Sequence, residues 1–126
     1  MVTPLYAALI AVLFIGLSFR TLTLRRKLQV GIGTGDNPAL ERAIAAHANC
    51  AEYAPLALLM VFFLEHLTGT GVTVHLLGAA LVVGRAVHAY GVSQINEDLR
   101  LRVFGMVLTL GCLISATTRV LLHYLA

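Results

Sequence analysis

Charged side chains are scarce in this 126-residue chain: 12% of its residues are Asp, Glu, Lys or Arg, whereas 59% are hydrophobic. Soluble globular domains carry about 25% charged residues, most of them on the surface that faces water. The composition therefore excludes an ordinary soluble protein and predicts a chain whose solvent is lipid. The formal net charge is only +3 and no long basic run is interleaved with aromatic residues, so no nucleic-acid partner is expected.

Cysteine is scarce as well. Only Cys50 and Cys112 are present, and both lie in apolar sequence without a CxxC motif or a Cys/His spacing. Neither a metal site nor a disulfide framework is therefore expected, and both thiols are predicted to be free and buried. The N-terminus lacks the basic segment and the small-residue cleavage site of a signal peptide, so we expect the first apolar stretch to remain as a membrane span.

Four apolar segments are present, and each has about the 20 residues that a helix needs to cross a membrane. The first is stopped by basic residues 25–27, and Asn37 before Pro38 is typical of a helix start. The sequence predicts one domain over residues 1–126, an all-α integral membrane protein that forms a four-transmembrane-helix antiparallel bundle. The predicted helices cover residues 4–24, 40–67, 72–91 and 100–123.

Basic residues lie almost entirely on one side of the predicted bundle. The first and third loops share that side, and the second loop contains neither Lys nor Arg. Because cytoplasmic loops are enriched in Lys and Arg, we expect these two loops to face the cytoplasm and both termini to lie opposite. Arg119 is the single exception. The basic residues on the predicted cytoplasmic side are Arg20, Arg25, Arg26, Lys27, Arg42, Arg85, Arg100 and Arg102.

Polar residues interrupt the first half of the second predicted helix. Helical spacing allows Arg42, Asn49 and Glu52 to share one face. An ionisable group facing hydrocarbon costs about 2.5–3.5 kcal/mol, so this face is expected to turn inward or to line a water-filled cavity. The side chains of Asn49 and Glu52 are too short to reach the membrane surface, which favours a functional role for both.

Two further helices bring cations to the same depth. Arg85 and His88 are three residues apart on the third predicted helix, and Arg100 and Arg102 open the fourth. Together with Glu52 they predict a pocket for a small anionic ligand that also carries an ammonium group, which Glu52 could pair.

Structural alternatives exist for several polar residues. Residues 25–27 are expected to extend to the membrane surface, to pair with lipid phosphates or with other polar residues at this end, and to fix the topology. His47 could be hydrogen-bonded within the bundle, and Tyr53 and Tyr90 could be interfacial anchors. Pro55 is expected only to bend the second helix.

No nucleophile of the chain itself can be assigned. The glycine-rich segment after the first helix follows no strand and lacks the GK[ST] ending of a phosphate loop. Neither a Ser/His/Asp nor a Cys/His set is present at a convincing spacing. Catalysis is therefore expected to proceed by activation of a ligand's own thiol, because a nearby arginine favours the thiolate form.

One run of the second helix resembles a known family. Glu41-Arg42 followed by Ala46-His47-Ala48-Asn49-Cys50-Ala51-Glu52-Tyr53-Ala54-Pro55 is similar to the second-helix signature of the MAPEG superfamily, the membrane-associated proteins in eicosanoid and glutathione metabolism. The resemblance covers nearly the whole chain. It includes the basic stop after the first helix, Gly84-Arg85 with His88, Arg100 or Arg102, Gly105 and Gly111.

The resemblance is to short bacterial members and to microsomal glutathione transferases. It implies a homotrimer in a bacterial inner membrane, with glutathione as co-substrate bound between subunits near the cytoplasmic face. It also implies detoxification chemistry on lipophilic small molecules: thiol conjugation, peroxide reduction or isomerisation. Arg102, or alternatively Arg100, would stabilise the thiolate. The implied glutathione-binding residues are Arg42, His47, Asn49, Glu52, Tyr53, Arg85, His88 and Tyr90.

Two positions depart from the pattern of the family's enzymes. Ala45 and Ala48 stand where several eicosanoid-forming members have arginines. One alternative is therefore a non-catalytic family member that binds membrane lipid or acts as a scaffold. A second is a small four-helix multidrug exporter that uses Glu52, but the carboxylate of such exporters usually lies in the first helix, and the arginines here would repel cationic drugs.

Overall fold

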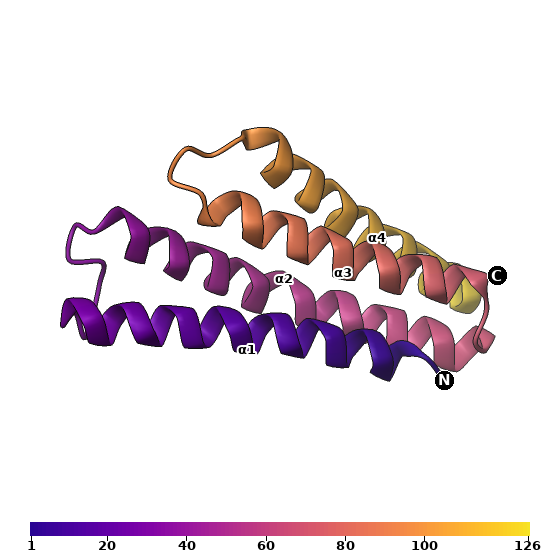
Figure 1. Cartoon of the computed structure of the whole chain (residues 1–126). Coiled ribbons are helices and arrows are strands. Elements are labelled where there is room, and N and C mark those ends of the chain that lie inside the picture. Colours follow the sequence, from indigo (N-terminus) through magenta and orange to yellow (C-terminus); the bar gives the residue numbers. More distant parts are fainter.

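The computed structural model describes residues 1–126 and contains four α-helices. They are α1 (Thr3–Leu28), α2 (Pro38–Thr68), α3 (Val72–Ser93) and α4 (Leu99–Leu125). They form an up-and-down bundle in which the α1–α2 and α3–α4 loops lie at one end, and both termini and the α2–α3 loop at the other (Figure 1). The predicted all-α four-helix bundle is therefore confirmed, and each helix contains an apolar window long enough to cross a membrane.

The two central helices are α2 and α3, each of which packs against both α1 and α4, whereas α1 and α4 do not touch each other. The closest crossing joins α3 to α4 at Gly84 and Gly105. A Cβ atom added to Gly105 would lie 2.6 Å from the carbonyl oxygen of Gly84. Small residues at such a crossing let two membrane helices approach closely. This approach brings the polar residues of α3 against the first turns of α4.

Large apolar side chains face outward over much of the bundle. Val12 and Phe19 of α1 and Val107 of α4 are each more than half exposed. The buried core instead contains many small residues, among them Ala46 and Ala57 of α2, which are fully buried. This distribution suits a bundle whose outer surface contacts lipid chains and whose helices are held together by close packing.

The loop between α1 and α2 is held by an arginine. Helix α1 continues to Leu28, beyond the predicted end, so that the basic residues 25–27 form its last turn, where cations stabilise the helix dipole. Arg25 Nη1 donates to the carbonyl oxygen of Gly33 at 2.9 Å and more weakly to those of Val30 and Gly31. Arg25 therefore binds its own loop, and the contact of residues 25–27 with lipid phosphates stays a prediction.

Helix α2 begins where the sequence indicated. The side chain of Asn37 accepts a hydrogen bond from Leu40 N at 3.1 Å, and Pro38 occupies the first turn, where its missing N–H is not needed. The helix has 31 residues, which gives a length of about 46 Å. Because the hydrocarbon core is about 30 Å thick, both ends of α2 extend beyond it when the helix spans a membrane.

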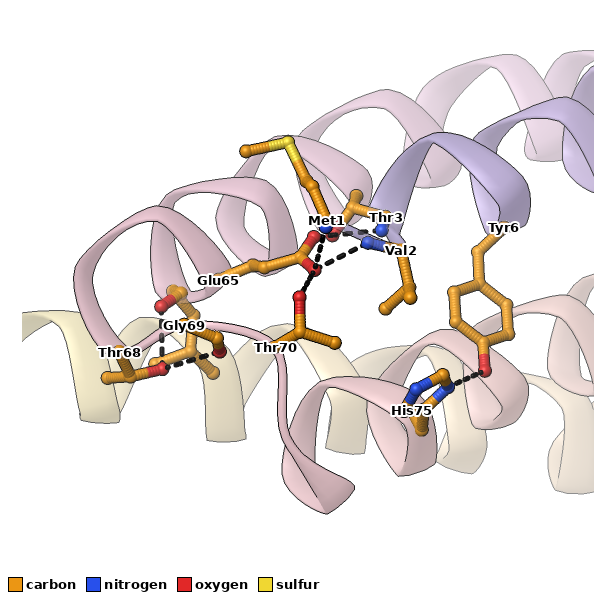
Figure 2. Close-up of polar contacts among 10 residues, drawn as sticks. Met1, Val2, Thr3, Tyr6, Glu65, Thr68, Gly69, Thr70 and His75 are labelled. Carbon is orange, nitrogen blue, oxygen red and sulfur yellow. Dashed lines mark hydrogen bonds and ion pairs between the residues drawn. The ribbon is translucent and has the colours of Figure 1, made fainter.

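A buried carboxylate closes the opposite end of the bundle. Glu65 of α2 is 3% exposed and accepts hydrogen bonds from Val2 N at 2.5 Å, Thr3 N at 2.8 Å and Thr70 Oγ1 at 2.6 Å (Figure 2). It thus satisfies the free N–H groups at the start of α1. Nearby, Tyr6 Oη and His75 Nδ1 lie 2.8 Å apart and join α1 to α3. Polar residues were predicted only in the first half of α2, so Glu65 was missed.

Candidate functional site

Two arginines and a glutamate meet at the end of the bundle that carries the α1–α2 and α3–α4 loops. Arg42 Nη1 of α2 donates to Glu97 Oε2 at 2.9 Å and to the carbonyl oxygen of Val92 at 3.0 Å. Arg102 Nη1 of α4 donates to Glu97 Oε1 at 3.5 Å. Glu97, in the α3–α4 loop, therefore bridges α2 and α4 with its two carboxylate oxygens.

A groove of about 320 Å³ opens beside this bridge. The hydrogen bond donated by Arg42, together with the positive charges of Arg102 and Arg42, lowers the pKa of the Glu97 carboxyl from its ordinary value, although partial desolvation opposes the shift. Two arginines and two carboxylates, Glu97 and the exposed Glu41, therefore meet at this groove. The groove is lined by Pro38, Glu41, Arg42, Ala45, Val92, Ile95 and Arg102.

Arg85 lies deeper, at the centre of a second polar cluster. Its side chain is 1% exposed. The Nε atom donates to Thr109 Oγ1 at 2.8 Å and Nη1 donates to Asn49 Oδ1 at 2.5 Å, while Nη2 is 3.2 Å from Met106 Sδ. The guanidinium carbon is also 5.7 Å from the centre of the Tyr53 ring. Arg85 is therefore buried in the single chain and bound to α2 and α4 there, and a direct contact with a ligand stays a prediction.

The contact with Arg85 orients Asn49. Because the side-chain oxygen of Asn49 accepts from Arg85, its amide nitrogen, which carries two donor hydrogens, has no partner within the chain. Asn49 is half-buried at the edge of the bundle. The arrangement therefore presents an oriented hydrogen-bond donor toward the outside of the subunit.

Glu52 points away from the four-helix core. The buried stripe of α2 includes Cys50 and Ala54, and Glu52, two residues after Cys50, is about 200° further round the helix. Its side chain is exposed and makes no hydrogen bond within the chain. Within one chain Glu52 therefore does not turn inward, which was one of the two expectations for this face, and the other, that it lines a water-filled cavity, stays a prediction. Glu97, which the sequence reasoning missed, is the carboxylate that pairs with the arginines.

Two of the candidate residues face α1. The ring of His47 stacks on Phe14 with centroids 4.6 Å apart, and its Nε2 lies 3.0 Å from Ser18 Oγ. Tyr90 is exposed on the side of α3 that faces Arg20. Neither residue therefore joins the Arg42–Glu97–Arg102 bridge within one chain, and His47 has the intramolecular hydrogen bond that was its structural alternative.

The remaining candidates lie close to the two clusters. His88 is 3% exposed and packs against Gly105 at the crossing of α3 and α4. Arg100 and Arg102 both lie in the first turn of α4, which begins after the N-cap residue Asp98. Arg100 uses its backbone N–H to bind the Asp98 side chain at 3.0 Å, and its guanidinium makes no contact. Of the two arginines, only Arg102 reaches the bridge.

An apolar groove of about 290 Å³ lies between α1 and α2. Pro55 lines it and removes one backbone N–H from α2, so the carbonyl oxygen of Ala51 has no helical partner. Both cysteines are free and buried, as predicted, and Cys50 forms part of the groove wall. The other lining residues are Ala7, Ile10, Ala11, Phe14, Ala51, Ala54 and Leu58.

Comparison with known proteins gives a family match along almost the entire chain. The MAPEG family model matches residues 3–122, which includes every residue of both polar clusters. Among curated proteins, the inner membrane protein YecN of Escherichia coli K12 is 38% identical over 91 residues, which cover 72% of this chain and 70% of that protein. The protein of the same name from Escherichia coli O6:H1 strain CFT073 matches to the same extent.

Proposed function

This chain belongs to the MAPEG family and is a multi-pass membrane protein, and from that premise we propose that it is a glutathione-dependent transferase or peroxidase. The enzyme would activate the thiol of glutathione for attack on lipophilic electrophiles or hydroperoxides that dissolve in the bilayer. We further propose that it works as a homotrimer. Its location is proposed to be a bacterial inner membrane, because its relative from Escherichia coli is named an inner membrane protein.

The observation that carries the proposal is the outward orientation of Glu52. It is the fifteenth of the 31 residues of α2, so it lies near the middle of that helix, and it is exposed. A carboxylate in that position would cost about 2.5–3.5 kcal/mol in contact with lipid. A neighbouring subunit that covers this face would remove the cost. Such an interface would be completed by a ligand whose ammonium group pairs with Glu52, as the amino group of glutathione could.

Asn49 supports the same location for the ligand. It lies three residues before Glu52, one turn away on α2, and its amide nitrogen is left free by the hydrogen bond from Arg85. In the proposed site Asn49 donates to glutathione, and Arg85 acts as a positioning residue that fixes the amide. Tyr53 and His88 belong to the wall around them, whereas His47 and Tyr90 are not assigned a ligand contact because they face α1.

Arg102 is the proposed thiolate-stabilising residue. Its guanidinium is about half exposed at the groove and has only Glu97 as a partner, whereas Arg100 makes no contact with the cluster. A guanidinium near a bound thiol lowers the pKa of that thiol because it stabilises the negative charge on sulfur. The thiolate then attacks an electrophilic carbon or a peroxide oxygen directly. The basic loops are proposed to face the cytoplasm, where glutathione would enter.

The test is direct binding to the detergent-solubilised protein. Glutathione should raise the unfolding temperature, because a ligand that binds only the folded state stabilises it. The complex should also show ultraviolet absorbance of the thiolate at a pH where free glutathione is protonated. S-methylglutathione, which has no ionisable thiol, is the matched control and should stabilise the protein without that absorbance. If glutathione changes neither quantity, the proposal is wrong.

A non-catalytic lipid-binding protein is the second candidate, and one observation favours it. The apolar groove between α1 and α2 has a volume of about 290 Å³ and is lined by Phe14 and Pro55, which suits an acyl chain. Ala45 and Ala48 also remove two cations that enzymes of the family use. Two results together would support this function. Lipid should copurify with the wild type but not with the Ala54→Leu variant, whose larger side chain fills the groove, and glutathione should have no effect on stability.

A further inference from the structure

The carboxylate of Glu97 lies between two arginines that come from different helices. Its Oε2 atom is 2.9 Å from Arg42 and its Oε1 atom is 3.5 Å from Arg102. We infer that Arg42 and Arg102 form a two-cation subsite for the anionic groups of a peptide thiol, and that Glu97 occupies this subsite in the ligand-free chain. This inference rests on the proposed function and assigns Glu97 the role of an internal competitor.

The accessibility of the three side chains fits a site that a ligand can enter. The side chain of Glu97 is 9% exposed, whereas those of Arg42 and Arg102 are 29% and 49% exposed. Both arginines line the 320 Å³ groove, but Glu97 does not. A ligand in the groove would therefore meet the guanidinium groups directly and would not need to pass the carboxylate.

Both arginines have the hydrogen-bonding capacity to bind the anionic groups of a ligand in place of Glu97. Each guanidinium has five N–H donors. Arg102 uses one of them, on Glu97, and Arg42 uses Nη1 for Glu97 and the Val92 carbonyl. Because Glu41 also lines the groove, the two arginines gain a surplus positive charge only when Glu97 moves away from them. A peptide thiol such as glutathione supplies a carboxylate for Arg42 and a thiolate for Arg102, which match the two cations better than Glu97 alone.

Of the three charged side chains, Glu97 is the one that can move aside most easily, because of its position in the chain. The arginines belong to α2 and α4, whereas Glu97 lies in the five-residue connection 94–98 between α3 and α4 (Figure 1). Displacement of Glu97 requires rotation of one side chain on a loop and leaves the helices in place. Arg42 also lies one turn before Ala45, and the small side chain of Ala45 leaves the groove open.

A purely structural role of Glu97 and a competing role predict opposite changes in ligand affinity when Glu97 is replaced. If Glu97 only held Arg42 and Arg102 in position, its removal would weaken ligand binding. If Glu97 competes with the ligand, Glu97→Gln should tighten glutathione binding by about fivefold or more, since it removes a direct rival for two charge-assisted hydrogen bonds. The pKa of the bound thiol should also fall in this variant, because Arg102 is then free to face the sulfur.

Glu41→Gln is the matched control. Glu41 lines the same groove and its loss changes the net charge by the same amount, but it is exposed and forms no ion pair. The affinity of this variant for glutathione should change by less than about twofold, because exposed charges are screened. Equal tightening in both variants would show a general charge effect and would overturn the inference, as would weaker binding by Glu97→Gln.

The experiment measures glutathione affinity by titration calorimetry, and the thiolate by absorbance, on the detergent-solubilised wild type and both variants. Should Glu97→Gln fail to fold, Glu97→Asp replaces it, because a carboxylate that is one methylene shorter cannot span both arginines, and tighter binding is again expected. If wild type binds glutathione and neither Glu97 variant binds more tightly, the inference alone fails. If no form of the protein binds glutathione, the proposed function fails and the subsite is overturned with it.

Discussion

Arg85 of α3 donates a 2.5 Å hydrogen bond from Nη1 to the side-chain oxygen of Asn49 on α2. The same guanidinium donates to Thr109 of α4, so one buried cation connects three helices. Because these donors bind inside the chain, we propose that Arg85 contributes to a ligand site by fixing the orientation of Asn49. Stability and ligand binding should therefore respond differently to changes at the two residues.

Substitution at these positions separates the two effects. Arg85→Ala leaves Asn49 and Thr109 without their partner and should destabilise the bundle by several kcal/mol, because each buried polar group without a hydrogen bond costs about 1–3 kcal/mol. Asn49→Ala should lower stability less but weaken glutathione binding by about tenfold, the typical value of one hydrogen bond to a charged ligand group. Unfolding curves and calorimetry on the two variants measure both quantities. Equal loss of stability in the two variants would contradict the positioning role.

Glu52→Gln tests the outward-facing carboxylate. The substitution keeps the shape of the side chain and removes its charge, so the pairing with the glutathione ammonium should be lost and affinity should fall by about tenfold or more. Trimer assembly, measured by light scattering in detergent, should be retained because the neutral amide is easier to cover than a carboxylate. A variant that binds glutathione as wild type does would remove Glu52 from the site.

The two arginines at the start of α4 offer a matched pair. Arg102 contacts Glu97, whereas the side chain of Arg100 makes no contact. Arg102→Ala should therefore abolish the thiolate absorbance and reduce turnover about 100-fold, the usual effect of losing one group that stabilises developing charge. Arg100→Ala should change turnover by less than about threefold. The reverse result would transfer the role to Arg100.

How far the sequence predicted this arrangement depends on the kind of feature. Apolar runs and breaks at Asn37 and Pro38 predicted four helices because membrane spans need long apolar segments. Periodicity also showed correctly that Asn49 and Glu52 lie near each other on α2. It could not show which face of α2 the other helices cover, so the inward orientation expected for Glu52 does not hold within one chain, and its alternative, a water-filled cavity, stays a prediction.

Long-range polar partners were the other features that the sequence did not reveal. Glu97 is 55 residues from Arg42, and nothing in a single sequence pairs a loop carboxylate with a particular arginine. The proximity of Glu97 to Arg102, five residues later, was a visible but weak signal. Thr109 likewise resembles any small hydroxyl residue in a membrane helix, and only the close α3–α4 crossing at Gly84 and Gly105 brings it to Arg85.

Glu65 should be important for stability and unimportant for ligand binding. It accepts hydrogen bonds from Val2 N and Thr3 N at the start of α1 and from Thr70 Oγ1, far from the arginine bridge at the other end of the bundle. Glu65→Ala should lower the free energy of unfolding by about 1–2 kcal/mol, the cost of losing a helix cap. Glutathione affinity should not change. Thermal unfolding of the ligand-free protein, followed by calorimetry with glutathione, tests both statements.

Acid should weaken the link between the helices at the arginine end. The hydrogen bond from Arg42 and the charge of Arg102 keep the pKa of Glu97 in the folded chain below its ordinary value, so the unfolded chain binds the proton more tightly. The contribution of the bridge to stability is therefore complete above the ordinary carboxyl pKa and is lost as the pH falls through the lower pKa of the folded chain. Unfolding temperatures between about pH 6 and pH 3 should fall more steeply for wild type than for Glu97→Gln, which has no proton to take up at this position. Because other carboxylates titrate in both proteins, the difference between the two curves is the measurement, and parallel curves would mean that the bridge contributes nothing to stability.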